Sequence, residues 1–414
     1  MVKIVNYNLS HYRNIRTADL SFENYNVIIG TNNSGKSNFI QSFGFLDFVI
    51  NAAAEEVDQA FKNGFRGGLY ESVLPNNHYL TEDAAAVPDI RFQLEWENTD
   101  TNRRFTYSLS LGWRPSRSVA MIPIFYIQSE SLAYKDLGKP GTPVRIFGRK
   151  ESKITYGADF PKFKSETSVL PSVSIIRLLQ VLGTGNAAYN DTLTSLNQVL
   201  KTPVFYFSHT ELTKNSKDKL NVHNGRLIAF ELEEEIIQLE QSPSWDIFKS
   251  AVHHVLGIEE VNIGSFVVGS HHHQGGQEIK YLSFTHARSI KSLKDFSDGS
   301  ILLIALIVKV LNSGHDIFFV EEPENSTHPK ALVDVVNFLQ SFAEYKQFII
   351  TSHSIVLLNK SKIDQIITAR QMDDGMSEFA NVSSRKELKA RLRSGATNFA
   401  DELFFDQVEV EDFD

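Results

Sequence analysis

The chain of 414 residues contains no cysteine, which excludes disulfides, thiolate metal sites and cysteine nucleophiles. It also lacks any run approaching the roughly 18 uninterrupted apolar residues that a membrane-spanning helix needs. The N-terminal segment MVKIVNYNLSHYRN alternates apolar and polar residues instead of forming the continuous apolar core of a signal peptide. These absences predict a cytoplasmic protein whose first residues form a β-strand.

Positive charge is in short supply as well. The 41 Lys and Arg residues are outnumbered by 50 Asp and Glu residues, which gives a formal net charge of −9. This balance argues against a surface coated with nucleic-acid-binding charge, although a local basic groove remains compatible with it. The last eight residues, QVEVEDFD, carry four carboxylates. We interpret them as a solvated tail, with an acidic contact for a partner as the alternative.

The stretch GTNNSGKSN at 30–38 lies between a predicted strand and a predicted helix. The strand is an apolar run formed by Val27, Ile28 and Ile29. The helix is indicated by apolar residues at i, i+4, i+7 and i+11, namely Phe39, Phe43, Leu46 and Ile50. Strand, glycine-containing loop and helix in this order form the context of a phosphate-binding loop.

The loop fits the pattern G-x-x-x-x-G-K-[ST] at Gly30, Gly35, Lys36 and Ser37. Glycines let the backbone N–H groups turn inward towards phosphate oxygens. The lysine ammonium reaches the β- and γ-phosphates, the serine hydroxyl binds Mg²⁺, and the helix N-terminus adds its positive dipole end. We therefore expect a nucleoside triphosphate to bind the loop residues Gly30, Asn32, Asn33, Ser34, Gly35, Lys36, Ser37 and Asn38.

A second candidate site is the segment DIFFVEEPE at 316–324. Four apolar residues, 317–320, predict a buried strand that carries Glu321 and Glu322 to its C-terminal edge beside the phosphate-binding loop. There Glu321 could hold Mg²⁺ through water, and Glu322 could polarise the attacking water as general base. The alternative is an exposed acidic turn before Pro323.

Two further stretches carry candidate residues. In ITSHS, His353 follows the predicted strand QFIITS, where an imidazole could touch a γ-phosphate; a structural or merely exposed histidine is the alternative. In DFSDGSILL, Ser297 is an N-cap candidate for a long apolar helix. Because backbone N–H groups at a helix start also bind anions, this element becomes a dimerisation switch if it faces a second subunit's nucleotide.

The remaining chain predicts both parallel and antiparallel strands. Apolar strands alternate with helices after residue 300, which indicates parallel strands buried on both faces. Residues 90–111 predict an antiparallel hairpin, helical patterns follow at 232–239 and 245–255, and residues 261–285 predict a second hairpin. Its connection contains the histidines 271–273, which we interpret as a hairpin tip rather than a Zn²⁺ site.

These elements, in this order, resemble the ABC-type ATPase heads of the RecF, SMC and OLD-like branch of AAA family ATPases. GTNNSGKSN is similar to that branch's Walker A, FSDGS to its signature motif, VEEPENSTHP to its Walker B with the following D-loop, and TSHS to its H-loop. The opening LSHYRNIRTADLSF also fits the branch. The resemblance covers residues 1–50 and 285–360 and says little about 115–260.

The resemblance implies an α/β P-loop fold of the ABC-ATPase type with a mostly parallel sheet core. We expect the core at 1–55 and 285–370. An antiparallel β lobe with a helical or mixed insertion would occupy 56–284, and a C-terminal extension with the acidic tail 371–414. Two departures are visible: the D-loop NSTHP lacks the usual aspartate, and the Q-loop is only suspected around 66–72.

The resemblance also implies ATP and Mg²⁺ as cofactors. Lys36, Glu322 and His353 would be catalytic, and Ser37 and Glu321 would serve the metal. Two more residues, Ser297 and Gly299, would contact ATP held by a partner subunit. A head-to-head homodimer or higher homo-oligomer, and a slow, switch-like ATPase, follow from this family pattern.

Three functions are compatible with such a head. We favour the ATPase subunit of a bacterial anti-phage defence system that controls a separate effector, with a nuclease as the expected kind. Only 61 residues follow His353, too few for the nuclease domain that OLD-like ATPases often carry. A RecF-like DNA repair or maintenance ATPase that binds duplex DNA is the alternative. A scaffold with a degraded site is disfavoured by the intact Lys36, Glu322 and His353.

Overall fold

The computed structural model describes residues 1–53, 88–114, 124–157, 170–182, 187–207, 226–268 and 277–384. The chain forms two compact units, which are considered separately below. The first comprises Met1–Val204, Asp316–Phe319 and Ala343–Asp414, and the second comprises Phe205–His315 and Val320–Phe342. The suspected Q-loop at 66–72, the histidines 271–273 and the acidic tail lie outside the described residues.

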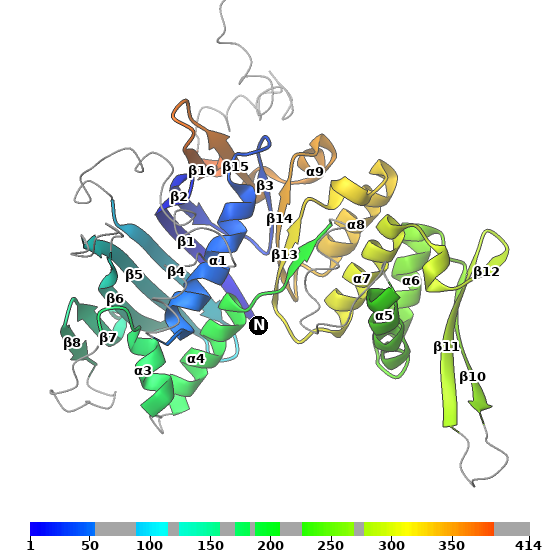
Figure 1. The fold of residues 1–414 in the computed structure, drawn as a ribbon, viewed down its shortest axis with the longest axis horizontal. Helices are drawn as coiled ribbons and strands as arrows, with labels where there is room; N and C mark the ends of the chain where they lie inside the picture. Colours follow the sequence, from blue (N-terminus) through cyan, green and yellow to red (C-terminus); the bar gives the residue numbers. More distant parts are fainter. Residues whose placement is uncertain are drawn as a thin grey trace, which may run out of the picture. The chain divides into compact units, whose positions relative to one another are not determined.

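A large mixed sheet, sheet A, runs through the first unit (Figure 1). Its strand order is β8-β7-β6-β5-β4-β1-β2-β16-β15-β3-β14-β13-β9. The bounds are β1 (Val2–Tyr12), β2 (Ile15–Ser21), β3 (Tyr25–Ile29), β4 (Ile90–Asn98), β5 (Arg103–Arg114), β6 (Ile124–Asp136), β7 (Val144–Lys150), β8 (Lys153–Tyr156), β9 (Val204–Tyr206), β13 (Ile317–Glu321), β14 (Gln347–Ser352), β15 (Ile366–Gln371) and β16 (Ser377–Asn381).

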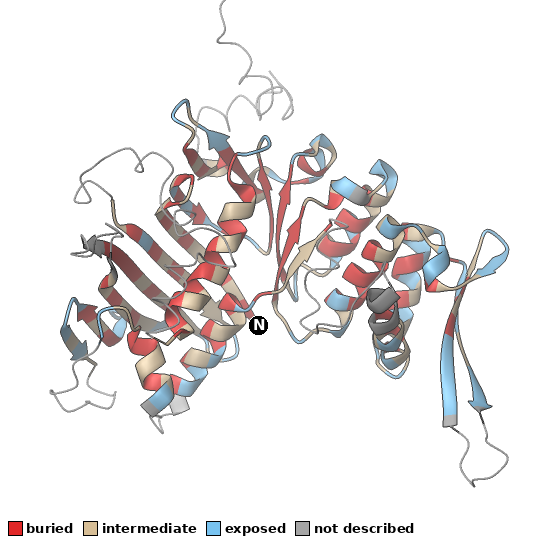
Figure 2. Cartoon of the chain, viewed as in Figure 1, coloured by how far each residue is buried: buried red, intermediate tan, exposed pale blue. Residues whose placement is uncertain are grey.

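The centre of sheet A is parallel, as the apolar strands predicted. β14 and β15 both pair in parallel with β3. Every residue of β3 and β14 is buried, and both strands are red along their whole length in Figure 2. Strands that are buried on both faces have nearly continuous apolar sequences, which is why short apolar runs without alternation identified them.

The other half of sheet A is antiparallel and continues from β1 through β4 to β8. The predicted hairpin at 90–111 is confirmed as β4 and β5. Its inward residues alternate with polar ones, and the buried set on β4 is Ile90, Phe92, Leu94 and Trp96. Because β4 pairs with β1, the antiparallel strands extend the same sheet that carries the phosphate-binding loop.

Helix α1 (Lys36–Asn51) packs on sheet A through the face that the sequence predicted, since Phe39, Phe43, Leu46 and Ile50 are all buried. The ring of Phe43 stacks on Tyr7 at 4.4 Å and approaches Phe319 at 4.9 Å. The other helices among the unit's described residues are α3 (Ile175–Leu182), α4 (Ala187–Leu200) and α9 (Ile355–Lys360), with short 3-10 turns η7 (Ile363–Gln365) and η8 (Val382–Ser384).

The second unit is mainly helical. It contains α5 (Arg226–Leu239), α6 (Trp245–Leu256), η5 (Leu293–Asp295), α7 (Asp298–Asn312), η6 (Pro323–Ser326) and α8 (Pro329–Ser341). Helix α7 contacts α5 and α6, and α6 also contacts α8. The predicted apolar faces are confirmed, because Leu232, Ile236 and Leu239 on α5 and Phe248, Val252 and Val255 on α6 are buried.

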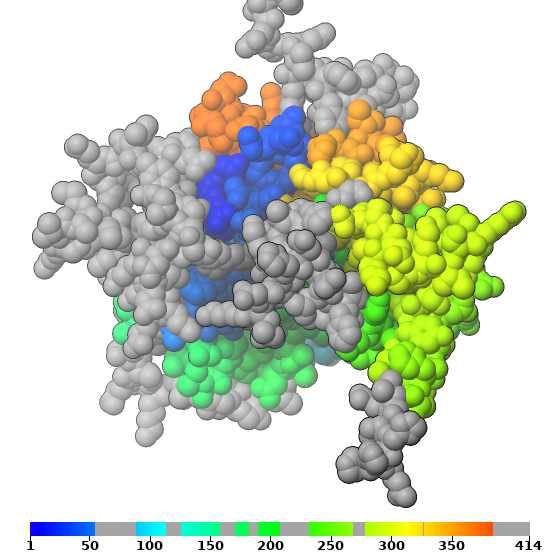
Figure 3. All heavy atoms as spheres, turned by 45° about the vertical axis from the view of Figure 1, so that its right-hand side comes forward, coloured from blue at the N-terminus to red at the C-terminus, as the bar shows by residue number. Residues whose placement is uncertain are grey.

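A three-stranded antiparallel sheet, sheet B, belongs to the second unit: β10 (Glu260–Val268), β11 (Gln277–His286) and β12 (Ser289–Lys291). The predicted second hairpin is confirmed as β10 and β11. One face of sheet B is buried at its base by Val261, Leu282 and Phe284. Away from this base, β10 and β11 extend from the unit's helices (Figure 3). Phe266, Ile279 and Tyr281 are exposed on these two strands, and Ile290 is exposed on β12.

No helix among the described residues is long and apolar enough to cross a membrane.

Candidate functional site

The loop between β3 and α1 has a backbone that turns N–H groups inward. Asn33 and Gly35 adopt left-handed conformations, with φ of 67° and 87°, and helical residues begin at Lys36. A left-handed residue followed by a right-handed one makes a concavity of backbone N–H groups that suits an anion. The start of α1 adds the positive end of the helix dipole. The local backbone is therefore that of a phosphate-binding loop.

Close packing explains why the first residue of the loop is glycine. A Cβ atom on Gly30 would lie 2.4 Å from the carbonyl oxygen of Ala369 and 2.5 Å from Oγ of Ser34. The hydroxyl of Ser34 is completely buried and finds no hydrogen-bond partner among the described residues. Because a buried hydroxyl without a partner is costly, the loop fits a ligand that brings oxygen acceptors, as a triphosphate does.

The side chain of Lys36 lies inside the loop. Only 4% of the residue is exposed, and its Nζ donates to the carbonyl oxygens of Gly30 and Thr31, both at 2.9 Å. The ammonium is therefore held where incoming phosphate oxygens could replace neutral carbonyls as its partners. Ser37 follows in the first helical turn and is half-buried, as a hydroxyl ligand of Mg²⁺ at the loop would be.

Two side chains support the loop through hydrogen bonds, and the sequence patterns did not identify either of them. Asn14, in the turn between β1 and β2, donates from Nδ2 to the carbonyl oxygen of Asn33 at 3.2 Å and to Oγ of Ser377 at 3.2 Å. Its Oδ1 accepts from Nδ2 of Asn38 at 2.7 Å. Asn14 thus links the loop, helix α1 and strand β16, and it lies against Gly35.

Arg13 is the second of these supports. Its Nη1 donates to Oδ1 of Asn38 at 2.8 Å and to Oε1 of Gln41, both on α1. Its backbone is left-handed, with φ of 52°, which is uncommon for a residue with a long side chain. The segment LSHYRN was noted only as part of a family resemblance. A positively charged side chain next to an amide, in the turn between β1 and β2, was the signal that could have marked it.

His353 is placed beside the loop by strand register. Ser352, the last residue of β14, pairs with Ile29, the last residue of β3. His353 and Gly30 therefore follow neighbouring parallel strands at the same end. The imidazole is exposed, and the chain then enters α9, which Ser354 caps by accepting from the N–H of Val356. The structure thus brings His353 and the phosphate-binding loop to one edge of sheet A.

The two predicted carboxylates lie at the end of β13, where Glu321 is the last residue of the strand and Glu322 follows it, and both belong to the second unit. Glu321 is largely buried, and its carbonyl oxygen accepts from the N–H of Phe207 at 3.2 Å. Glu322 has a left-handed backbone, with φ of 47°, and its Oε2 accepts from Nδ2 of Asn325 at 2.7 Å. Such a conformation costs on the order of 1–3 kcal/mol for a residue other than glycine and is typical of functional sites.

The predicted N-cap role of Ser297 is confirmed. The residue has extended backbone angles and precedes α7, and its Oγ accepts from the N–H of Ser300 at 3.3 Å. Ser297 is exposed, and Gly299 lies in the first turn of α7. Exposed N–H groups at the start of an apolar, buried helix form an anion-binding geometry. Contact with a partner subunit's nucleotide remains a prediction for both residues.

The structure therefore gathers the loop residues 30–38 and His353 in the first unit, and places Ser297, Gly299, Glu321 and Glu322 in the second. In the described part of the chain, no three His, Asp or Glu side chains form a cluster that could hold a metal.

The sequence matches a known family over residues 25–359, and the family's description is "AAA domain, putative AbiEii toxin, Type IV TA system". The match covers most of the chain, so the protein belongs to this AAA-domain family. The predicted membership of AAA family ATPases is thereby confirmed. No curated protein matches the sequence.

Several solved structures are similar to the whole chain at low sequence identity. The SMC head domain from Thermotoga maritima is 11% identical with a TM-score of 0.42, covering 92% of this chain and 98% of that one. An SMC head bound to the C-terminal winged-helix domain of ScpA is 13% identical with a TM-score of 0.48, covering 91% and 97%. An SMC head bound to the ScpA C-terminal domain from Pyrococcus furiosus is 11% identical with a TM-score of 0.47, covering 95% and 100%.

Removing the ammonium from the loop should abolish nucleotide binding. We expect Lys36→Ala to weaken ATP binding by at least about a hundredfold, because several charge-assisted hydrogen bonds to phosphate are lost together. Isothermal titration calorimetry measures the effect. Lys139→Ala is the matched control, since Lys139 is exposed in the same unit and should leave the affinity unchanged. Tight binding by Lys36→Ala would contradict the assignment of the loop.

Removing the support below the loop should weaken binding without abolishing it. Asn14→Ala loses hydrogen bonds to Asn33 and Asn38, each of which contributes about 1 kcal/mol. We expect ATP affinity to fall by about tenfold, measured by the same titration. Thr101→Ala, in a distant turn of the same unit, is the control. An unchanged affinity for Asn14→Ala would show that the loop keeps its shape without this amide.

Proposed function

We propose, on the premise of this AAA-family membership, that the protein is a cytoplasmic, Mg²⁺-dependent ATPase that dimerises on ATP and regulates a separate effector in bacterial anti-phage defence. The observation that carries the ATPase part is the phosphate-binding loop itself, with Lys36 held inside it and His353 at the same sheet edge. The finer parts rest on the family resemblance and on the residues discussed next.

In nucleotide binding, each group of the site would have a separate role. The backbone N–H groups around Gly35 would hold the phosphates, and Lys36 would exchange its two carbonyl partners for phosphate oxygens. Mg²⁺, held by Ser37 and through water by Glu321, would neutralise charge on the phosphates. His353 would contact the terminal phosphate and so distinguish the triphosphate from the diphosphate.

Hydrolysis would depend on Glu322 as general base. Its carboxylate accepts a hydrogen bond from Asn325, and its left-handed backbone fixes its direction at the end of β13. A positioned carboxylate contributes roughly 10²–10⁴-fold to such a proton transfer. The strained backbone of Glu322 is consistent with a residue whose carboxylate must keep one fixed position.

The switch would operate between protomers. Ser297 is exposed, and the N-terminus of α7, with Asp298 in its first turn, presents an anion-binding geometry. We infer that a second protomer's ATP binds there, so that ATP favours a closed dimer and hydrolysis reopens it. The population shifts only as far as ATP binds the closed form more tightly than the open form.

The defence role draws support from the description of the family. That description names a putative toxin and a type IV toxin–antitoxin system, which are terms for the family and not for this chain. An ATPase in such a system needs an effector that acts on the cell or its invader. We therefore propose a separate effector protein as partner, with a nuclease as the favoured kind.

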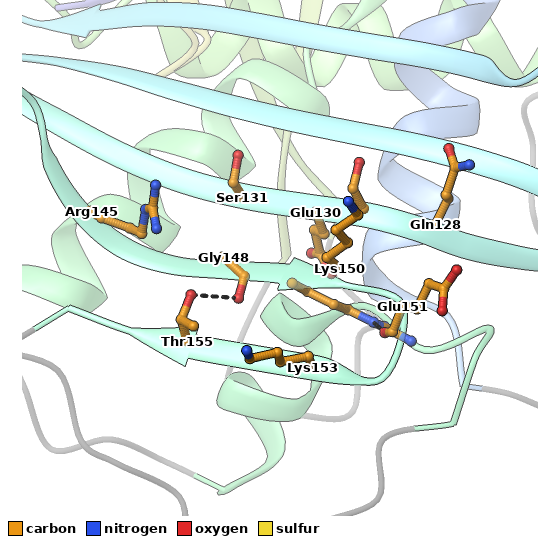
Figure 4. Close-up of a pocket in the computed structure, with 11 residues that line it drawn as sticks. Gln128, Glu130, Ser131, Arg145, Gly148, Lys150, Glu151, Lys153 and Thr155 are labelled. Atoms are coloured by element: carbon orange, nitrogen blue, oxygen red, sulfur yellow. Dashed lines mark hydrogen bonds between the residues drawn. The ribbon is translucent and has the colours of Figure 1, made fainter.

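One observation favours the second candidate, a RecF-like ATPase that binds duplex DNA. A hollow of about 550 Å³ lies on the first unit at β6, β7 and β8, and Figure 4 shows its side chains. Arg145, Lys150 and Lys153 line it, and none of the three forms an ion pair with a carboxylate of the described residues. Hydroxyls and an amide also line it, from Gln128, Ser129, Ser131 and Thr155, together with two carboxylates, those of Glu130 and Glu151.

The hollow continues into a second one of about 460 Å³ that shares Gln128 and Ser129 and adds Arg91 and Gln93. Arg, Lys, Ser, Thr, Asn and Gln side chains are those that contact phosphate oxygens in protein–DNA interfaces. The buried Arg149 is not part of this charge, since its guanidinium donates to four backbone carbonyls and lies near Glu130. The chain's charge of −9 keeps DNA binding in second place.

The general base assignment predicts a separable phenotype. Glu322→Gln should bind ATP normally and lose turnover by at least about a hundredfold, because the amide cannot accept the proton. Calorimetry and a phosphate-release assay measure the two quantities. Glu324→Gln, two residues along in the same turn, is the matched control and should retain turnover. A normal rate for Glu322→Gln would contradict the assignment.

The same variant traps the state that should hold the effector. We would express Glu322→Gln from its native gene neighbourhood and identify what co-purifies in ATP. An effector protein at fixed stoichiometry supports the defence proposal. Nucleic acid without a protein partner would replace it with the DNA-binding candidate.

The DNA candidate has its own test. If the basic hollow binds duplex phosphates, Lys150→Glu combined with Lys153→Glu should weaken DNA binding and lower the slope of log affinity against log salt by about two. Fluorescence anisotropy with a labelled duplex measures both. Lys139→Glu combined with Lys330→Glu changes charge equally outside the hollow and should have a smaller effect. Equal losses for the two double variants would exclude a specific role of the hollow.

A further inference from the structure

The proposed signature element follows sheet B after a very short connection. Strand β12 ends at Lys291, η5 occupies Leu293–Asp295, and Phe296 immediately precedes Ser297. The connection is internally fixed, because Oδ2 of Asp295 accepts from both the N–H and the hydroxyl of Ser292, at 2.8 and 2.7 Å. Leu293 is completely buried. The short connection therefore gives Ser297 little freedom to move relative to sheet B.

The side chain of Phe296 contacts sheet B. Its ring meets Phe284 edge-on, with centroids 5.4 Å apart and an interplanar angle of 82°. His286 makes a second edge contact at 5.8 Å, and Nζ of Lys291 lies 5.5 Å from the ring centroid. Edge-to-face rings and a cation near a ring face are both favourable and directional. Phe296 is thus held from two strands.

The two bodies on either side of this contact are firmly built into the second unit. Phe284 is completely buried at the base of sheet B, and β11 contacts α5. On the other side, α7 is buried along most of its length and contacts α5 and α6. Ser297 lies between these bodies with extended backbone angles, φ −67° and ψ 154°. The position of Ser297 is therefore set jointly by the cap of α7 and by the anchoring of Phe296.

We propose that Phe296 is a positioning residue: it anchors Ser297 to sheet B and so holds the Ser297 hydroxyl and the start of α7 ready for a second protomer's triphosphate. The inference rests on the proposed dimerisation function. Phe296 touches no phosphate itself; it acts through Ser297.

The test separates ATP binding by one protomer from closure of the dimer. In the Glu322→Gln background, Phe296→Ala should leave the Kd for ATP within about twofold, because Lys36 and its loop belong to the first unit. The ATP-dependent dimer, measured by analytical ultracentrifugation, should weaken at least tenfold. In the chain with Glu322 intact, kcat should fall at least tenfold while KM changes little. Phe296→Tyr, which keeps the ring, should restore both.

A second variant guards against loss of folding. His286→Ala removes one of the two edge contacts from a half-buried position and should weaken the dimer by a smaller factor than Phe296→Ala. Phe266→Ala is the matched control, because Phe266 lies on the same sheet with half of its surface exposed and far from Phe296 in sequence and register. It should dimerise normally. Circular dichroism confirms that each variant is folded.

Ser297→Arg separates failure of this inference from failure of the function beneath it. If Ser297→Arg prevents ATP-driven dimerisation while folded Phe296→Ala and His286→Ala dimerise as tightly as the parent, the positioning role is overturned and the proposed function stands. If Ser297→Arg dimerises normally, the signature assignment is wrong and the positioning role falls with it. Loss in Phe296→Ala with rescue by Phe296→Tyr supports the inference.

Discussion

The packing of Phe43 is the contact on which the first unit's site depends. Its ring lies against Tyr7 of β1 and Phe319 of β13, so α1 is fixed to two strands that are far apart in the sequence. The loop before α1 can then be short and glycine-rich, because its C-terminal end is already anchored. The hydroxyl of Tyr7 also bonds to Ser42 of α1 at 2.9 Å. Burial of these rings supplies the stability that a strained loop by itself lacks.

The polar groups around the loop form a second layer that depends on this packing. Asn14 and Arg13 reach α1 and the loop because β1 and β2 place the turn between them next to both elements. Asn14 also bonds to Ser377 on β16, which ties the support to a strand from the other end of the chain. Left-handed residues at Asn33 and Gly35 are acceptable in this setting, since the surrounding hydrogen bonds determine their conformation.

Much of this fold follows from local pattern, and the exceptions have physical causes. Continuous apolar runs identified β3, β13 and β14, and the 3.6-residue spacing identified α1 and α8, while α7 was predicted from its long apolar sequence. Strands β6 to β8 were not predicted. The register of β6 shifts between Leu132 and Ala133, and that of β5 between Ser110 and Leu111, which interrupts the alternation that marks a strand. Nor could local pattern show that β4 pairs with β1.

The residues of the candidate site also fall into two groups, those that local sequence identifies and those that it does not. A phosphate-binding loop is a contiguous motif, so its residues could be named from the sequence together with His353 and the two carboxylates. Asn14 and Phe296 could not, because their roles are defined by partners across strands and not by spacing. Glu322 lies between these cases: its residue type was readable, but the left-handed backbone that aims it was not. Sequence thus identifies the groups that do chemistry more readily than those that hold them.

The bonds of Lys36 suggest why such a site would respond to the number of phosphates. In the loop the ammonium donates to two neutral carbonyls, at 2.9 Å each. A hydrogen bond between charged partners is roughly twice as strong as one to a neutral acceptor, so binding gains most when an anionic oxygen can replace each carbonyl. A diphosphate brings fewer such oxygens within reach than a triphosphate does. Under the proposed function, the exchange of these carbonyls for phosphate oxygens would favour ATP over ADP, which is the difference in affinity that a nucleotide switch requires.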